Sequence, residues 1–126
     1  CSIGVIEQKA RKLKKSKTLK FAEIVKNYSS GKDDFREIIE DSARWLGLAI
    51  ANQINFLIPD RIILTGEMLE LGERFCKKVN ESIEEYVFPA FRKEVTIGIS
   101  DAWRENAALG AASLLVRKVF EDTKYL

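Results

Sequence analysis

The feature that most constrains the fold is a strand–helix–strand pattern in residues 61–101. Residues 61–65 read RIILT, a short run rich in β-branched side chains that predicts a fully buried strand. A helix that Pro89 stops is predicted next, because apolar side chains recur every four residues at Leu71, Phe75, Val79, Ile83 and Val87. In residues 95–99 apolar side chains alternate with small or polar ones, which predicts a half-buried strand. The two strands of such a βαβ unit run parallel, with a right-handed crossover.

This unit makes the chain an α/β protein whose sheet is incomplete. Two strands do not form an independently stable sheet, and a parallel sheet needs helices on both of its faces. We therefore expect residues upstream of Cys1, or a partner chain, to complete the sheet. The 126 residues begin with Cys1 rather than with a methionine, which favours a fragment of a longer protein.

The other segments are mostly helical. Residues 9–20 carry seven basic side chains without interleaved aromatics, and we interpret them as a solvated segment rather than a nucleic-acid-binding face. Thr18 is the expected N-cap of a helix over residues 19–28. An apolar stripe predicts a long helix over residues 33–57 that is buried all round in its second half and ends at Pro59. A last helix, residues 104–121, contains the small-residue run NAALGAAS and is expected to pack tightly on the sheet.

Composition excludes several classes of protein. The chain is 46% hydrophobic and 32% charged, as in an ordinary soluble domain, and its net charge of +2 does not attract nucleic acid strongly. It contains no histidine, so histidine-based acid–base catalysis is excluded in these residues. The longest apolar run, residues 45–58, is shorter than the roughly 20 residues that span a bilayer. With no signal peptide, a cytoplasmic protein without a membrane segment is expected.

A candidate ligand loop follows the first strand at Thr65, Gly66 and Glu67. In a parallel sheet, ligands bind beyond the carboxyl ends of the strands, where a glycine lets the backbone approach and a helix N-terminus offers free N–H groups. Glu67 places a negative charge in that position. A tight phosphate site is therefore not expected, whereas an adenine-side contact or a purely structural turn at Gly66 both remain open.

Three longer segments stand in a characteristic order: IIEDSARWLGLAIANQINFLIPDRIILTGE, FPAFRKEVTIGIS and ENAALGAASLL. Their order and spacing resemble the carboxy-terminal third of the ROK family (repressors, open reading frames, kinases), over residues 22–119. The resemblance implies an incomplete actin-like (ribonuclease-H-like) ATPase domain, mostly helical with a parallel βαβ unit. Residues 1–17 would be the remnant of a zinc and sugar segment with a basic linker, and residues 18–126 the helical and βαβ portion.

Family members are ATP-dependent sugar kinases or sugar-responsive regulators with an added amino-terminal winged helix. The catalytic aspartate of the kinases precedes this region, so no catalytic residue is expected here. Gly4-Val5-Ile6-Glu7 is similar to the G-C-L-E end of the family's zinc segment. Because valine replaces the cysteine, and Cys1 and Cys76 supply two ligands where a structural zinc needs four, no metal site is expected. Glu7 matches the glutamate that contacts sugar hydroxyls in the kinases.

Thr65-Gly66-Glu67 also resembles the repressor branch, because the kinases usually carry G-G-G after this strand. Our first hypothesis is thus a sugar-sensing regulator that binds a sugar, forms a homo-oligomer and reaches DNA only through an upstream domain. The second is an ATP-dependent ROK sugar kinase, with ATP as its cofactor. The third is a module that only dimerises. The 126 residues alone are expected to have no enzymatic activity.

Overall fold

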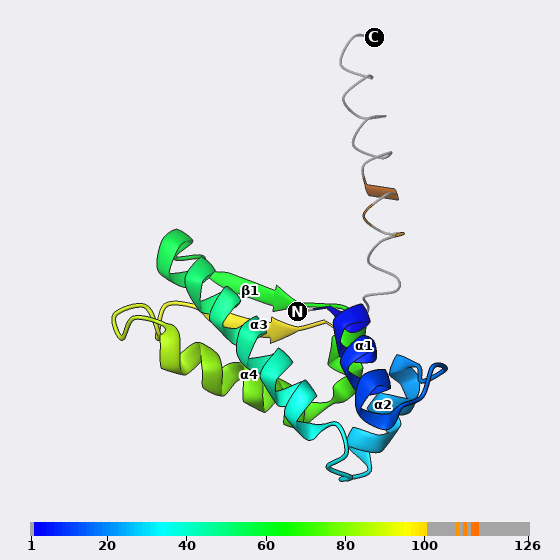
Figure 1. Ribbon diagram of the computed structural model, residues 1–126. Coiled ribbons are helices and arrows are strands. Elements are labelled where there is room, and N and C mark those ends of the chain that lie inside the picture. Colours follow the sequence, from blue (N-terminus) through cyan, green and yellow to red (C-terminus); the bar gives the residue numbers. More distant parts are fainter. Residues whose placement is uncertain (1, 101–107, 109, 111, 114–126) are drawn as a thin grey trace, which may run out of the picture.

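The computed structural model describes residues 2–100, 108, 110, 112 and 113. The order of elements is helix, helix, helix, strand, short 3-10 helix, helix and strand (Figure 1). Their bounds are α1 Ile3–Lys14, α2 Phe21–Ser29, α3 Arg36–Leu57, β1 Arg61–Leu64, η1 Glu67–Leu71, α4 Glu73–Tyr86 and β2 Thr96–Ile99. This is a mostly helical unit with a small parallel sheet, as predicted.

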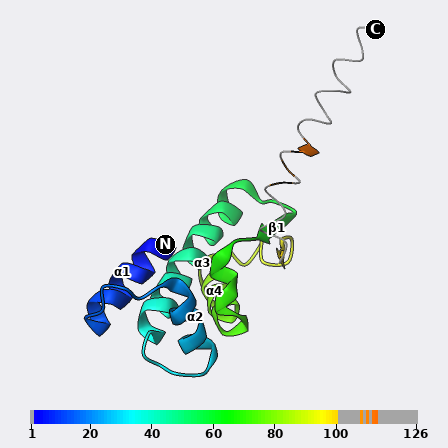
Figure 2. The same ribbon diagram turned by 90° about the vertical axis from the view of Figure 1, so that its right-hand side faces the viewer.

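The two strands pair in parallel, which confirms the predicted βαβ unit. Their register sets Ile62 beside Ile97 and Ile63 beside Gly98. Ile62 and Ile97 pack against the hydrophobic core, and Figure 2 shows α3 and α4 on the same side of the strands. Ile63 points to the opposite face and is 58% exposed. The described residues alone therefore do not bury the first strand fully as predicted, because no helix among them covers that second face.

The pairing of α3 with α4 forms the centre of the core. The predicted four-residue spacing is confirmed in α4, where Phe75, Val79 and Ile83 are buried. Gly47 of α3 lies against Ser82 of α4 so closely that a Cβ atom built on the glycine would be 2.5 Å from the Ser82 Cβ atom. The glycine thus permits the two helices to approach at this point.

The basic amino-terminal run is solvated as predicted, but its first half is helical, which the sequence did not predict. Residues 9–14, half of the run, belong to α1, which the Ser2 hydroxyl caps by accepting a hydrogen bond from the Val5 N–H at 3.4 Å. Ile6 and Ala10 are buried on one side of this helix, while its lysines face solvent. Two buried positions four residues apart supply a narrow apolar stripe that the high density of lysines concealed. α2 follows from Phe21 with Lys20, not Thr18, at its N-cap.

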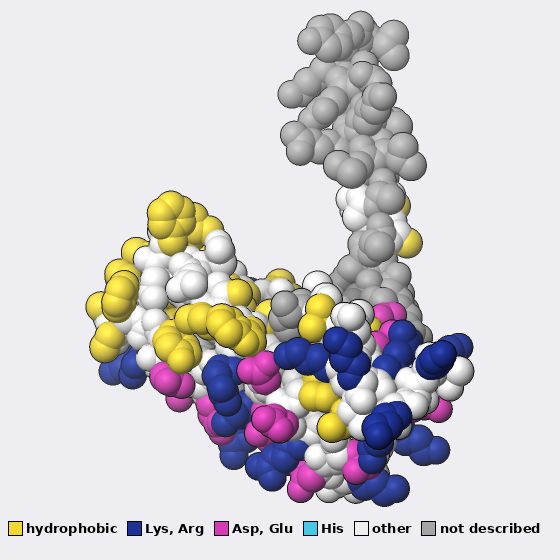
Figure 3. Space-filling model, in the orientation of Figure 1, with side chains coloured by type: hydrophobic (Ala, Val, Ile, Leu, Met, Phe, Trp, Pro, Cys, Tyr) yellow, Lys and Arg dark blue, Asp and Glu magenta, His cyan; other side chains and the backbone are white. Residues whose placement is uncertain are grey.

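The second half of α3 is not buried all round, which corrects another prediction. Trp45 is 60% exposed and Phe56 is 85% exposed, while Ile50, Ala51 and Ile54 on the other side of the same helix are buried. Figure 3 shows apolar side chains gathered at the carboxyl end of α3. Pro59 follows the end of the helix as predicted, after Ile58 in a left-handed conformation.

Two further observations bear on the predictions. Among the described residues, no helix is both long and apolar enough to cross a membrane. The predicted packing of the NAALGAAS helix on the sheet falls largely on residues outside those described, and it remains a prediction.

Candidate ligand site at the carboxyl ends of the strands

The loop after β1 holds the three residues that the sequence singled out. Thr65 and Glu67 are exposed and Gly66 is half-buried. Gly66 has φ 120° and ψ 170°, a backbone conformation that residues with a Cβ atom rarely adopt. Gly66 is therefore required for the geometry of the turn itself, whatever the loop binds.

The loop does not open directly into an α-helix, contrary to the prediction. Residues Glu67–Leu71 form the short 3-10 helix η1, and Gly72 with φ 82° then leads into α4. Leu71 is buried, so η1 is held against the core by its last residue. Because η1 ends after five residues, its N-terminus lacks the long row of aligned peptide dipoles that anion sites at α-helices use.

Carboxylates dominate the charge of this loop. Glu67 and Glu70 lie in the first turn of η1, and Glu73 begins α4. Three negative charges over seven residues disfavour a triphosphate at this edge of the sheet, although exposure to solvent weakens the effect. Glu70 and Glu73 therefore strengthen the expectation, based at first on Glu67 alone, that this loop does not hold a tight phosphate site.

Glu7 lies in α1 and uses both of its carboxylate oxygens inside the protein. One accepts a hydrogen bond from the main-chain N–H of Phe21 at 2.8 Å, and the other pairs with the Arg11 guanidinium at 2.9 Å. Arg11 in turn donates to the Leu19 carbonyl at 2.8 Å. Glu7 therefore ties α1 to the start of α2. A carboxylate has about four lone-pair positions, so it retains accepting capacity for a further donor.

The structure does not bring Glu7 and the strand-end loop side by side. In Figure 1, α1 lies beyond the carboxyl end of β1, but the turned view of Figure 2 places α1 and β1 on opposite sides of α3. The two elements are connected indirectly, because α2 packs on η1. A ligand that contacts both places would have to bridge the space beside α2.

Arg74 organises an ionic cluster that the sequence did not reveal. Its guanidinium lies 3.1 Å from Asp33, 3.6 Å from Glu40 and 4.8 Å from the centre of the Tyr28 ring. Burial raises the pKa of Tyr28, and the positive charge of Arg74 partly opposes that rise. The cluster joins α2, α3 and α4. Arg74 is distant in sequence from its three partners, so no spacing rule could have found the cluster.

Asn55 is a second residue whose structural role the sequence did not reveal. Its side-chain amide donates to the Tyr86 carbonyl at 2.9 Å, and its side-chain oxygen accepts from the Phe88 N–H at 2.9 Å. These bonds fasten the end of α3 to the end of α4. Asn55 is one of three polar residues, with Asn52 and Gln53, in an otherwise apolar helical stretch, so the sequence alone did not single it out.

The residues present do not fit a structural zinc site. Val5 lies in α1 and has no ligating atom, and the described residues contain no cluster of three potential metal ligands. Cys76 is free and half-buried, and burial raises the pKa of its thiol. A thiol that resists ionisation is a poor metal ligand and a poor nucleophile.

Comparison with known proteins agrees with this α/β arrangement. The sequence pattern of the ROK family matches residues 1–118. The chain therefore belongs to the ROK family.

Characterised relatives include both an enzyme and regulators. The chain is 30% identical over 94 residues to the DNA-binding transcriptional dual regulator NagC of Escherichia coli K12, which covers 75% of the chain and 23% of the relative. It is 26% identical over 78 residues to a glucokinase of Halalkalibacterium halodurans, which covers 62% of the chain and 24% of the relative. The chain thus spans about a quarter of the length of these relatives.

Proposed function

We propose that the chain is the carboxy-terminal part of a sugar-responsive transcriptional regulator of the ROK family. The observation that carries the proposal is the acidic loop at the strand ends, where Glu67, Glu70 and Glu73 stand at the edge at which parallel sheets commonly bind phosphate groups. The likeness to NagC supports the same choice. A regulator of transcription acts where the DNA is, so we place it in the cytoplasm.

We further propose that an actin-like domain surrounds this unit. On the outer face of the sheet the large apolar side chain of Ile63 is exposed, as it would be at a surface that further elements cover. DNA binding would belong to a separate domain outside these 126 residues. Sugar binding would then act by favouring one of two arrangements of the protein, and operator affinity would follow the difference in sugar affinity between them.

Glu7 is the proposed sugar contact within this chain. Its carboxylate is held by Arg11 and by the first N–H of α2, so it is oriented before any ligand arrives. Such preorganisation lowers the entropic cost of binding. Because the same carboxylate joins α1 to α2, a sugar hydroxyl that competes for it would alter the contact between the two helices. This gives a physical link between ligand and conformation.

A matched pair of substitutions separates this role from a structural one. Glu7→Gln and Arg11→Gln both remove the Glu7–Arg11 ion pair, but only the first removes the carboxylate. We expect Glu7→Gln to weaken binding of N-acetylglucosamine or glucose by tenfold or more, and Arg11→Gln to have a much smaller effect, in calorimetric titrations of the intact protein. Equal losses in the two variants would assign Glu7 a purely structural role.

The second candidate is an ATP-dependent sugar kinase, which the glucokinase relative favours. The two are separated by incubating the intact protein with ATP and each sugar in a coupled assay for ADP. The regulator predicts no sugar-dependent ATP turnover and a sugar-dependent change in operator binding. ATP turnover that requires the sugar would show that the protein is a sugar kinase and would overturn our proposal. For the 126 residues alone, no phosphorylation is expected in either case.

A further inference from the structure

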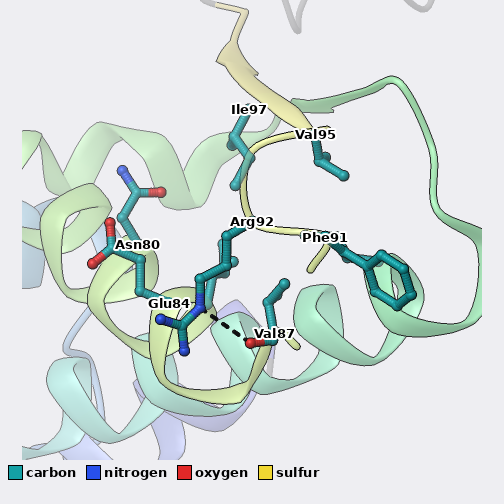
Figure 4. Close-up of a pocket in the computed structure, with 9 residues that line it drawn as sticks. Asn80, Glu84, Val87, Phe91, Arg92, Val95 and Ile97 are labelled. Carbon is teal, nitrogen blue, oxygen red and sulfur yellow. Dashed lines mark hydrogen bonds between the residues drawn. The ribbon is translucent and has the colours of Figure 1, made fainter. Parts of the chain in front are cut away.

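A cavity of about 260 Å³ opens at the other end of the sheet from the acidic loop (Figure 4). It lies between the end of α4, the segment 88–95 and the start of β2. Its floor is apolar and is formed by Ile54, Ile83, Val87 and Ile97, of which the first three are almost completely buried. An apolar cavity of about 150 Å³ suffices to bind benzene in an engineered protein, so this one has room for a branched or aromatic side chain.

The rim of the cavity carries one cation, one anion and one amide: Arg92, Glu84 and Asn80. Arg92 reaches from the loop toward α4, where Glu84 and Asn80 lie, and its Nε atom donates to the Val87 carbonyl at 3.2 Å (Figure 4). This bond anchors the guanidinium while leaving its terminal N–H groups available. In the part of the chain that the structure describes, neither Arg92 nor Glu84 forms an ion pair.

The chemistry of the rim selects among classes of ligand. A simple carboxylic acid would satisfy Arg92 but would meet the charge of Glu84, and a simple amine would have the reverse difficulty. A sugar would place hydroxyl groups on an apolar floor that offers them no hydrogen bonds. A ligand with a carboxylate, an ammonium group and an apolar body satisfies every feature at once.

We propose that this cavity binds an α-amino acid with an apolar side chain. Arg92 receives the carboxylate, Glu84 receives the ammonium group, and the side chain enters the cavity over Ile54, Ile83 and Ile97. The Asn80 amide is available to either polar group of the ligand. The site is separate from the strand-end loop and from Glu7, so it would be a second input to the protein and not part of sugar recognition.

The test is a calorimetric or NMR titration of the intact protein with L-phenylalanine, phenylacetate and phenethylamine. The last two probes each lack one of the charged groups but keep the aromatic ring. We expect L-phenylalanine to bind about three- to tenfold more tightly than either, the range for charge-assisted contacts at a partly solvated rim.

Variants assign the contacts. Arg92→Gln should weaken the binding of L-phenylalanine to about the affinity of phenethylamine, which lacks the carboxylate. Glu84→Gln should weaken it to about the affinity of phenylacetate, which lacks the ammonium group. Lys93→Gln and Glu85→Gln change the same charges at exposed neighbours that do not line the cavity, and they should have no effect.

Two results would overturn the proposal. One is that L-phenylalanine does not bind, or binds no more tightly than phenylacetate and phenethylamine. The other is that Glu84→Gln strengthens phenylacetate binding while leaving L-phenylalanine unchanged, which would mean that Arg92 and Glu84 neutralise each other. Circular dichroism of each variant confirms that the fold is retained. Neither result bears on the proposed regulator, which is tested at Glu7 and by ATP turnover.

Discussion

Replacing Gly47 with alanine tests whether the close contact of α3 and α4 determines the stability of this unit. The added Cβ atom would lie 2.5 Å from the Ser82 Cβ atom and 2.7 Å from the Val79 carbonyl oxygen. Carbon atoms in contact normally stand about 3.5–4.0 Å apart, so the helices must separate by roughly 1 Å. The Val79 oxygen belongs to the main chain and cannot move aside by a side-chain rotation.

The expected cost follows from two opposing terms. Overpacking of a core contact destabilises by about 1–3 kcal/mol, and the shift also stretches the hydrogen bond that Ser82 donates to the Arg44 carbonyl at 3.1 Å. Alanine regains up to about 1 kcal/mol over glycine through its higher helix propensity. We therefore expect Gly47→Ala to lower the free energy of unfolding by about 1–2 kcal/mol.

Urea unfolding monitored by circular dichroism measures this change. Gly4→Ala in α1 is the matched control, because nothing lies within 4 Å of a Cβ atom built there, and it should be neutral or slightly stabilising. Adding Ser82→Gly to Gly47→Ala removes one of the two clashes and should restore part of the loss. If Gly47→Ala is as stable as Gly4→Ala, the described contact between the helices is wrong.

Three further predictions concern single side chains. Asn55→Ala should lower the free energy of unfolding by about 1–2 kcal/mol, because two hydrogen bonds to the end of α4 are lost, while Asn52→Ala on the exposed side of α3 should have little effect in the same urea experiment. The buried Tyr28 hydroxyl has no hydrogen-bond partner among the residues that the structure describes, so Tyr28→Phe should leave the urea midpoint unchanged or raise it. Hydrogen bonding, above all from Lys14, holds the pKa of Asp34 below its ordinary value of 3.8. Its stabilising effect is thus present above pH 3.8 and is lost as the pH falls through the lower folded-state pKa; Asp34→Asn should reduce that acid-dependent loss, and an unchanged acid titration of stability would contradict this.

The successes and failures of sequence reasoning have a common cause. The stripe of α3, the spacing of α4 and the alternation in β2 are local periodicities, and all three elements formed where they were expected. The helical state of the basic segment was missed because two buried residues, Ile6 and Ala10, give a weak periodic signal among many lysines. The 3-10 helix after Gly66 was missed because its tighter winding leaves no distinct pattern over five residues.

The candidate site residues also divide into those that the sequence marks and those that only the fold brings together. Glu7, Thr65, Gly66 and Glu67 were singled out as candidates because a family motif or a strand-end position marks them, and their binding roles remain predictions. Two other groups combine residues from different elements: the ionic cluster of Arg74 and the rim of the cavity at Arg92. No single segment of the sequence shows that these residues meet.

By itself the sequence determined the family, the helices with strong apolar periodicity and the parallel pairing of two strands, since each depends on residues that are near neighbours or on a recognisable ordered motif. Only the tertiary structure decided which apolar side chains are buried, leaving Phe56 and Ile63 exposed while Ile54 and Ile62 pack inward. It also decided that Glu7 bonds to Arg11 and to the start of α2. Burial and hydrogen-bond partners depend on which elements meet in space, and that is a property of the whole arrangement of helices and strands rather than of any one stretch of residues.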